Sequence, residues 1–398
     1  MTRSLFCFGL GYTSLALAET LRRAGWRVAG TCRSAERARA LEAAGIPAFV
    51  WAPEEGKRLG DAGVAALRDA THVLVSVPPT ERLDDESESE RDANDGDARA
   101  TRSRMDARVV DPVLADAACV AALERKSRPR AKDAKKLAWL AYLSSTGVYG
   151  DHSGNFVDET STCVPTTSKT RARLAAERAW AAFARRANNR SAGVPLRVFR
   201  LGGVYGPRRS LLDAAVRAES GAKKSRSRAS SSSSSSRFSR AFVARCHVRD
   251  VVAILCASVS RAEAAADAPL VRTYNAADDA PAPRAVALAF AEALLAETRG
   301  DGATADAACV SGGAEKTTQT DSIGPSANGP EPEPQPLPDG ASIARARAKN
   351  DRGEKRVRND RAKTELGVAF AFPTYAEGLA AIANGDTSPF SDALLDVL

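Results

Sequence analysis

The fold is decided by the stretch SLFCFGLGYTSLALAETLRRAGWRVAGTCR, residues Ser4 to Arg33. Leu5 to Phe8 is an apolar run of strand length, and the glycine turn GLGYTS follows it directly. Apolar residues then recur at helical spacing until a second apolar run, Trp26 to Thr31, predicts another strand. Strand, glycine turn, helix and strand in this order is the context in which a G-x-G-x-x-G match indicates dinucleotide binding.

The glycine turn has the chemistry of a pyrophosphate cradle. Gly9 permits the tight turn, and Gly11 lets the backbone approach a phosphate with no Cβ in the way. The helix that follows offers unpaired N–H groups and the positive end of its dipole. Ser14 replaces the third glycine and is small enough for close helix–strand packing. We predict that Gly9, Gly11 and Ser14 bind the cofactor together with Tyr12 and Thr13. A ligand-free strand–turn–helix is the alternative.

The end of the second strand indicates which dinucleotide is bound. An NAD site usually presents Asp or Glu there to the ribose 2′-hydroxyl, whereas Arg suits a 2′-phosphate. This chain has Thr31-Cys32-Arg33-Ser34 and no acid. We therefore predict NADP(H) in preference to NAD(H), with Arg33 on the 2′-phosphate. An exposed Arg33 that only opens the next helix is the alternative.

Strands alternate with helices along the chain, which predicts an α/β fold with a doubly wound parallel sheet of the Rossmann type. The fourth strand begins at His72, and its last residues Ser76 and Val77 lie where open α/β sheets bind ligands, so we expect both to contact the cofactor. Further strands are expected at 46–51, 137–143, 196–201, 242–248 and 271–275. Further helices are expected at 35–44, 64–68, 111–123, 170–187, 251–259, 284–297, 362–366 and 375–382.

Three segments have compositions that predict disordered insertions. They are an acidic one at about 83–106, a serine-rich one at about 221–240, and one at about 300–352 that contains EPEPQPLP. A basic loop is expected at 125–136. The remaining chain divides into an NAD(P)-binding domain, 1–210, and a part at 211–398 that holds the rest of the sheet and a small C-terminal α/β substrate lobe.

Composition and charge exclude several classes of protein. The 398 residues are 44% hydrophobic, and seven cysteines and three histidines form no metal-binding pattern, so we expect no metal. No apolar run reaches the length of a membrane span, and the first strand begins too early for a signal peptide, which predicts a cytoplasmic protein with no membrane partner. The net charge of +8 lies in blocks such as 125–136 and 223–240. These blocks lack interleaved aromatic residues, so we do not expect a nucleic-acid partner.

Five segments resemble, in order, those of the extended short-chain dehydrogenases/reductases, the NAD(P)-dependent epimerase/dehydratase-like family. They are LSSTGVYG from Leu143, Asp158-Glu159, FRLGGVYGP from Phe199, HVRDVV from His247 and YNAADD from Tyr274. The resemblance implies a nicotinamide cofactor and a small carbonyl or sugar-derived substrate. It also implies that the backbone of Gly202 and Gly203 faces the nicotinamide carboxamide.

The resemblance further implies catalytic residues. In the family, a Ser or Thr polarises the substrate oxygen, which assigns Ser145 with Thr146 beside it. A tyrosine then transfers the proton, and a lysine four residues later lowers the pKa of that tyrosine. The family pattern P-x-x-x-Y-x-x-x-K, counted from Pro165, puts Lys169 at the tyrosine position and Arg173 at the lysine position. The usual pair is therefore replaced.

This replacement leaves two interpretations open. The protein is either an oxidoreductase or epimerase-like enzyme that uses Lys169 and Arg173, or a catalytically inactive NADP(H)-binding sensor or scaffold. Tyr149 is a further catalytic candidate because the tyrosine of this turn borders the family's substrate pocket; packing of a strand–loop junction is its alternative. A homodimer through the helices at 107–124 and 170–187 also stays open.

Two other groups have an implied place. His247 and Asp250 match a family segment that tethers the second lobe, and we expect them to be structural. Lys355, Arg356 and Arg358 stand where many sugar-nucleotide relatives meet the substrate phosphate. A solvated basic loop is the alternative for these three.

Overall fold

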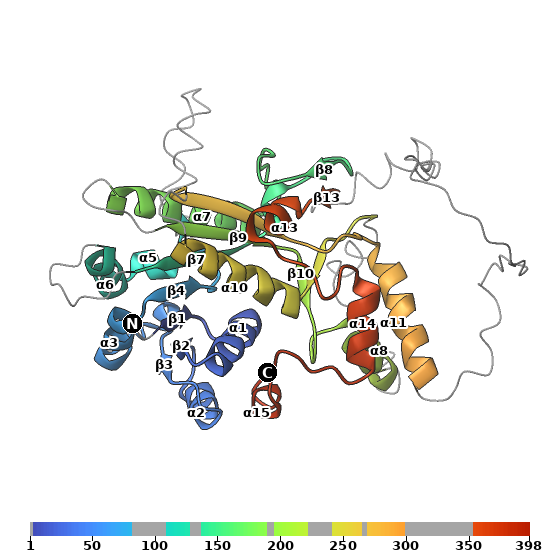
Figure 1. Ribbon diagram of the computed structural model, residues 1–398, viewed down its shortest axis with the longest axis horizontal. Coiled ribbons are helices and arrows are strands. Elements are labelled where there is room, and N and C mark those ends of the chain that lie inside the picture. The colour runs from blue at the N-terminus through green and yellow to red at the C-terminus, as the bar shows by residue number, and fades with distance from the viewer. Residues whose placement is uncertain are drawn as a thin grey trace, which may run out of the picture.

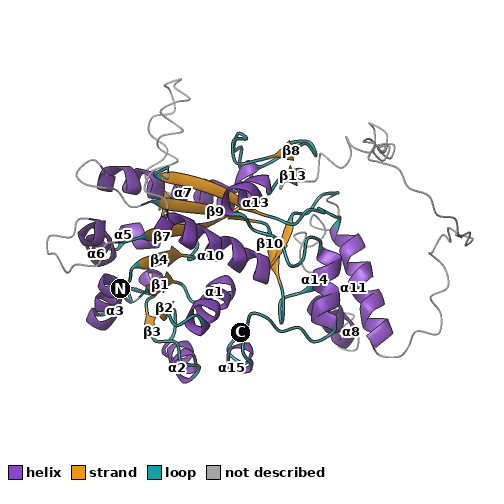
Figure 2. Cartoon of the chain, in the orientation of Figure 1, coloured by secondary structure: helices purple, strands orange, loops and turns teal. Residues whose placement is uncertain are grey.

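A seven-stranded parallel sheet forms the centre of the protein (Figures 1 and 2). The computed structural model describes residues 3–81, 109–127, 137–188, 195–221, 241–264, 269–298 and 353–398. The strand order is β12-β9-β7-β4-β1-β2-β3. These strands are β1 (Ser4–Phe8), β2 (Arg27–Cys32), β3 (Ala48–Val50), β4 (His72–Val75), β7 (Trp139–Ser145), β9 (Leu196–Leu201) and β12 (Val271–Ala276). The predicted Rossmann-type fold is confirmed.

Alternating side chains of each strand divide the core into two layers. In β1, Leu5 and Cys7 enter one layer, whereas Phe6 and Phe8 enter the other. The first layer is covered by α1 (Tyr12–Arg23), α2 (Ala35–Ala43) and α10 (Val248–Ala264). The second is covered by α3 (Asp61–Asp69), α6 (Ala117–Ser127) and α7 (Ser168–Asn188). Helices on both faces bury the sheet, as near-continuous apolar strands require.

A smaller lobe is built by α8 (Leu211–Gly221), α11 (Arg284–Thr298) and α14 (Tyr375–Ala383), which pack on one another at one side of the molecule (Figure 1). Two short parallel pairs lie beside the sheet, β10 (Gly203–Tyr205) with β11 (Arg245–His247) and β8 (Phe156–Val157) with β13 (Arg356–Val357). The other elements are η1 (Pro53–Glu55), β5 (Thr80–Glu81), β6 (Val109–Val110), α5 (Pro112–Ala115), η2 (Thr146–Tyr149), α13 (Asp360–Leu366) and α15 (Asp392–Leu395).

The structure corrects some local predictions. The helix expected at 111–123 is two helices, because the Asp116 carboxylate accepts the N–H groups of Ala118 and Cys119 and starts a new one. That helix, α6, runs to Ser127 and includes the start of the expected basic loop. The strand expected at 242–248 is only β11, because α10 begins at Val248.

The remaining sequence predictions fall mostly beyond what the structure describes. The three low-complexity segments and the rest of the basic loop lie largely outside the described residues. The domain boundary at residue 210 stays a prediction; it falls just before α8. Within the described part of the chain, no helix combines the length and apolar character needed to cross a membrane.

Candidate functional site: a dinucleotide turn and a polar pocket

The glycine turn is fixed by strands on both sides. Gly9 has φ +89°, and a Cβ added there would lie 2.9 Å from both the Ser76 Oγ and a Val77 methyl carbon. The Gly9 N–H donates to the Thr31 Oγ1 at 2.9 Å. Ser76 Oγ in turn donates to the Gly9 carbonyl at 2.7 Å. Only glycine satisfies this backbone conformation and this close approach together.

The N-terminus of α1 fits a pyrophosphate. Gly11 is its N-cap, no side chain caps it, and a Cβ added at Gly11 would meet no atom within 4 Å. Ser14 is 1% exposed, and its Oγ has no hydrogen-bond partner in the described part of the chain. An open helix N-terminus with unpaired donors is the arrangement that phosphate groups need. The residues of this turn therefore fit the pyrophosphate of a nicotinamide dinucleotide.

Tyr12 links this turn to the segment after β10. Its hydroxyl donates to the Pro207 carbonyl at 2.9 Å, and its ring packs against Phe390 with centroids 5.1 Å apart. The Arg209 guanidinium carbon lies 5.2 Å from the centre of the Tyr12 ring. Burial raises the pKa of Tyr12, so the phenol stays protonated as the donor in this link. Thr13 follows on the same half-buried first turn of α1.

Arg33 is exposed at the end of β2, where the 2′-phosphate was predicted. Ser34 after it caps α2 by accepting the Arg37 N–H at 3.2 Å. The sequence-based prediction overlooked Arg37, a second cation in the first turn of α2. Its signal was the N-cap serine, which fixes where that turn begins.

The two serines at the end of β7 have different partners. Ser144 is buried, and its hydroxyl donates to the Glu177 carboxylate, which also pairs with Arg200 at 2.8 Å. Ser145 Oγ accepts the Gly147 N–H at 3.1 Å. Because this contact uses Ser145 as an acceptor, its own hydroxyl proton stays available to another group.

Ser145 lines a cavity of about 640 Å³, which we call the serine pocket. The pocket brings together Ser145, Lys169, Gly202 and Gly203 from the sequence predictions. Its full lining is Ser145, Thr146, Gly147, Thr166, Thr167, Ser168, Lys169, Thr170, Leu201, Gly202, Gly203, Phe242, Val243, Ala244, Gly353, Lys355 and Val357. The hydroxyl groups just before and within the start of α7 were missed, although the run TTSKT was a visible signal.

Arg173 and Tyr149 do not line the serine pocket. The Arg173 guanidinium donates to the Leu143 carbonyl at 3.0 Å and lies over the Tyr142 ring. Tyr149 is fully buried, its hydroxyl donates to the Asn275 Oδ1 at 2.8 Å, and burial raises the pKa of Tyr149 to about 12. Catalytic roles for these two residues stay predictions.

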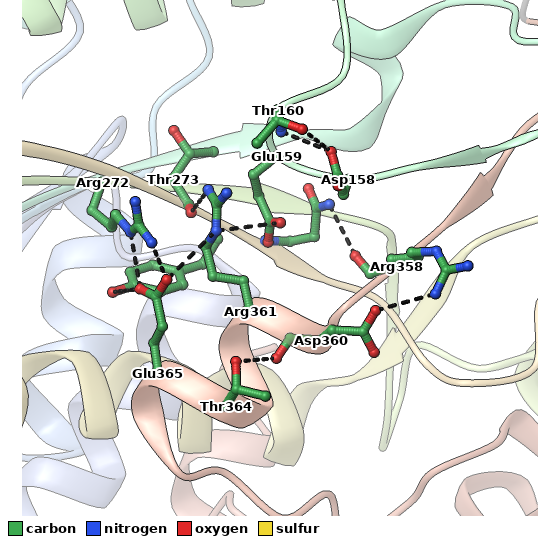
Figure 3. A network of polar contacts seen from close by, with 12 residues as sticks. Asp158, Glu159, Thr160, Arg272, Thr273, Arg358, Asp360, Arg361, Thr364 and Glu365 are labelled. Carbon is green, nitrogen blue, oxygen red and sulfur yellow. Dashed lines mark hydrogen bonds and ion pairs between the residues drawn. The ribbon is translucent and has the colours of Figure 1, made fainter.

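A polar network holds Asn275 in place. The Asn275 N–H donates to the Glu159 carboxylate at 2.8 Å, and Arg361 Nε lies 3.7 Å from the other Glu159 oxygen. Arg361 also pairs with Glu365, which binds Arg272 (Figure 3). The network joins α13 to β12. It also positions Asn275, which accepts the Tyr149 hydroxyl. The Asp158-Glu159 segment is therefore structural in this chain.

The basic residues before α13 are already engaged. Lys355 lines the serine pocket, and its Nζ donates to the Gly150 carbonyl at 2.9 Å. The Arg356 guanidinium lies 4.1 Å from the Phe156 ring centre and 5.2 Å from that of Phe242. Arg358 also lies over Phe156, at 4.5 Å. Cation–π packing of this kind orients the arginines without a phosphate.

The HVRDVV segment connects the two lobes. Asp250 accepts the N–H groups of Ala371 and Phe372 and so anchors the chain that leads to α14. His247 is 1% exposed, its Nδ1 accepts the Arg249 N–H, and its ring lies 4.3 Å from that of Phe372. These contacts are structural, in agreement with the sequence prediction.

Acid is expected to weaken the fold through His247. Burial lowers the pKa of His247 from 6.5 to about 4, so its stabilisation is present above pH 6.5 and is lost as the pH falls towards 4. Between pH 7 and about pH 4.5 the loss should be about 2 kcal/mol. We expect the free energy of unfolding, measured in urea, to fall between these two pH values in both proteins. The fall in His247→Asn should be about 2 kcal/mol smaller than the fall in wild type. Equal falls in the two proteins would contradict a role of His247 in the loss of stability in acid. The packing lost in the substitution lowers stability equally at both pH values, so it does not affect this comparison.

Comparisons place this arrangement among known folds. No protein-family model matches the chain, and no curated protein sequence matches it. A conserved protein of unknown function from Silicibacter pomeroyi is 28% identical, with a TM-score of 0.55 over 96% of this chain and 99% of that one. UDP-glucuronic acid 4-epimerase from Bacillus cereus, solved with NAD, is 12% identical with a TM-score of 0.55 over 96% of each chain.

A second enzyme gives the same result. UDP-N-acetylglucosamine 4-epimerase from Bacillus cereus is 9% identical, with a TM-score of 0.51 over 96% of this chain and 98% of that one. At these identities the likeness to the two epimerases concerns the fold. The resemblance seen in the sequence motifs is confirmed at that level.

Proposed function

Starting from a chain with the fold of the extended short-chain dehydrogenases/reductases, we propose that the protein is an NADP(H)-dependent oxidoreductase or epimerase-like enzyme. Its substrate is a small carbonyl or sugar-derived compound. The observation that carries the proposal is the serine pocket, which Ser145, Lys169, Gly202 and Gly203 line together. Ser145 accepts a hydrogen bond there, so its hydroxyl proton stays available to a ligand. The hydroxyl-rich lining suits a polar, hydroxylated ligand.

The residues divide the work as follows. When bound, the nicotinamide supplies hydride to the substrate carbon or accepts it. Ser145 donates its hydroxyl proton in a hydrogen bond to the substrate oxygen and stabilises charge that develops there. Lys169, exposed at the start of α7, donates the proton that this oxygen needs during reduction. Arg173 donates to the Leu143 carbonyl and so places its positive charge next to β7, near the end that carries Ser145.

Cofactor preference is proposed to depend on Arg33. We expect Arg33→Ala to weaken NADPH binding about 10- to 100-fold, because a charged hydrogen bond to the 2′-phosphate contributes about 1.5–3 kcal/mol. NADH binding should not change, since NADH lacks that phosphate. Fluorescence titration of wild type and variant with both nucleotides makes the measurement.

Arg39→Ala is the matched control. Arg39 is exposed like Arg33, but it lies on α2, more than one helical turn from the end of β2. Equal weakening of NADPH and NADH binding in Arg33→Ala, or equal effects of the two substitutions, would remove the basis for NADP(H) preference. Failure of wild type to bind either nucleotide would refute the cofactor itself.

Two observations favour a second candidate function. Arg173 is bound to a backbone carbonyl, and the position that the family fills with tyrosine carries Lys169. A protein with this pair could bind NADP(H) and act as a sensor or scaffold with no turnover. NADPH binding combined with no NADPH oxidation across a panel of small aldehydes, ketones and sugar-derived carbonyls would select this alternative. The cytoplasmic location and the homodimer stay predictions.

A further inference from the structure

Helix α7 carries an excess of positive charge. Its sequence contains six cations and one acid, Glu177, which is buried and pairs with Arg200. Some of the cations are exposed and, within the described part of the chain, form no ion pair with an acid; these are Lys169, Arg171, Arg185 and Arg186. Like charges on one helix repel one another unless an anionic partner lies against them.

The charges at the start of α7 oppose the dipole of the helix. The first turn contains no acid and carries Lys169 and Arg171, although the positive end of the dipole lies there. Arg171 donates to the Thr166 carbonyl at 3.1 Å, a neutral group that leaves its charge uncompensated. An acidic partner at this end would therefore stabilise the helix as well as its cations.

The exposed positions of α7 form one stripe, which we call the α7 stripe. Positions 171, 178, 182 and 185 are exposed, and separations of this kind put residues on one side of a helix. Ala176, Trp180 and Phe183 on the other side are buried in the core. A partner that lies along the stripe can therefore contact the cations near both ends of α7.

An acidic stretch of the same chain begins and ends beside α7. β5 and β6 pair antiparallel, with Thr80 opposite Val110, so the chain between them leaves and returns at one place. Both strands contact α7, and the Asp111 carboxylate after β6 accepts the Trp180 Nε1–H at 2.9 Å. Residues 84–97, between these strands, contain eight acids and one arginine, which gives a net charge of −7.

The length of this acidic segment matches that of the helix. α7 has 21 residues and is about 30 Å long, so neither end lies more than about 20 Å from the level of Trp180. Residue 90, in the middle of the segment, is nine residues from Glu81, and that length of extended chain spans up to about 30 Å. The acids can thus reach both ends of the stripe.

We propose that the acidic segment, residues 84–97, binds along the α7 stripe of its own chain and neutralises Arg171, Arg185 and Arg186. Opposite charge and the anchor at β5 and β6 select this occupant, because a tethered segment acts at an effective concentration on the order of millimolar. The bound segment covers a helix that the homodimer predicted from the sequence would use, and it therefore favours a monomer. This inference concerns α7 and does not depend on the proposed enzymatic function.

A labelled peptide tests whether the stripe is occupied. Fluorescence anisotropy at low salt measures binding of a synthetic peptide of residues 83–98 to wild type and to a neutral-segment variant. This variant is the full-length chain with the eight acids of 84–97 changed to Asn or Gln. For a peptide Kd of about 0.1 mM, we expect wild type to bind about tenfold more weakly than the variant, because its own segment competes at about 1 mM.

Charge reversals locate the binding site. Arg171→Glu, Arg185→Glu and Arg186→Glu, combined in the neutral-segment variant, should weaken peptide binding at least about tenfold. The matched control reverses three exposed arginines elsewhere and should change the affinity no more than about threefold. Its substitutions are Arg27→Glu, Arg39→Glu and Arg58→Glu.

Two results would overturn the proposal: equal peptide affinities in wild type and the neutral-segment variant, or equal effects of the two sets of reversals. The first comparison alters no residue outside 84–97, so it stands even if the reversals disturb folding. Light scattering over a range of protein concentrations identifies the source of the segment. A monomeric wild type that excludes the peptide supports binding within one chain. Exclusion seen only where wild type is dimeric would assign the stripe to the segment of a second copy and also overturn the proposal.

Discussion

Glu177→Leu is expected to lower the free energy of unfolding by about 3–5 kcal/mol, because it leaves Arg200 as an unpaired buried charge. The Glu177 carboxylate binds the Arg200 guanidinium at 2.8 and 3.2 Å and also accepts the Ser144 hydroxyl. Both ion-pair side chains are less than 10% exposed. Urea unfolding at neutral pH makes the measurement.

Two comparisons separate the buried charge from ordinary packing. Glu365→Leu removes a partner of both Arg272 and Arg361, but Arg361 keeps Glu159, and the Arg272 and Glu365 side chains are about a third exposed, so the loss should not exceed about 1 kcal/mol. The double variant Glu177→Leu with Arg200→Leu should recover much of the lost stability, since no charge is then left unpaired. A double variant less stable than Glu177→Leu would contradict this account.

The sheet was predictable because its signals are local. β1 and β4 are short apolar runs ended by Gly9 and by prolines, and the intervening helices have apolar faces at regular spacing. Two α-helices were missed, α8 and α15. α8 lies directly before the serine-rich segment, whose composition obscures the helical pattern of the apolar residues after Ser210. α15 lies beyond the last helix expected from the sequence, 375–382, yet Leu394 and Leu395 are buried in the core.

The site was predictable only in part, for a geometric reason. Residues of the glycine turn are neighbours in sequence, so their spacing carries the signal. Lys169 and Arg173 are four residues apart on α7, which puts them on one helix face. Spacing alone does not show that Lys169 lines the serine pocket while Arg173 binds the Leu143 carbonyl.

The cavity of about 440 Å³ in the smaller lobe, which five arginines line, had no sequence signal of its own. Its arginines come from the turn after β10, from α8, from β11 and from the start of α11. These residues are far apart in the sequence and lie around one cavity only because β10, β11, α8 and α11 pack together. That the Arg245 Nη2 has no hydrogen-bond partner among the described residues is likewise a property of tertiary structure, since two carbonyls orient its guanidinium.

Ser145→Ala is expected to lower kcat about 100- to 1,000-fold while NADPH affinity stays the same. The loss follows from removing the hydroxyl donor proposed to stabilise the oxygen on which charge develops, and a single donor of this kind contributes about that much rate enhancement. Ser145 also accepts the Gly147 N–H, so a stability loss of about 1 kcal/mol should accompany the substitution. NADPH oxidation with the best substrate of the carbonyl panel gives the rate.

The neighbouring serine provides the control. Ser144 donates to Glu177 and lies outside the serine pocket, so Ser144→Ala should lower stability but change kcat by no more than about threefold. Parallel losses of kcat in the two variants would mean that the substitutions act through the fold. A rate loss confined to Ser145→Ala, with unchanged NADPH binding, requires that its hydroxyl acts after the cofactor is bound. In that case Ser145 differs chemically from Ser144 because it caps η2 by accepting the Gly147 N–H and lines the pocket.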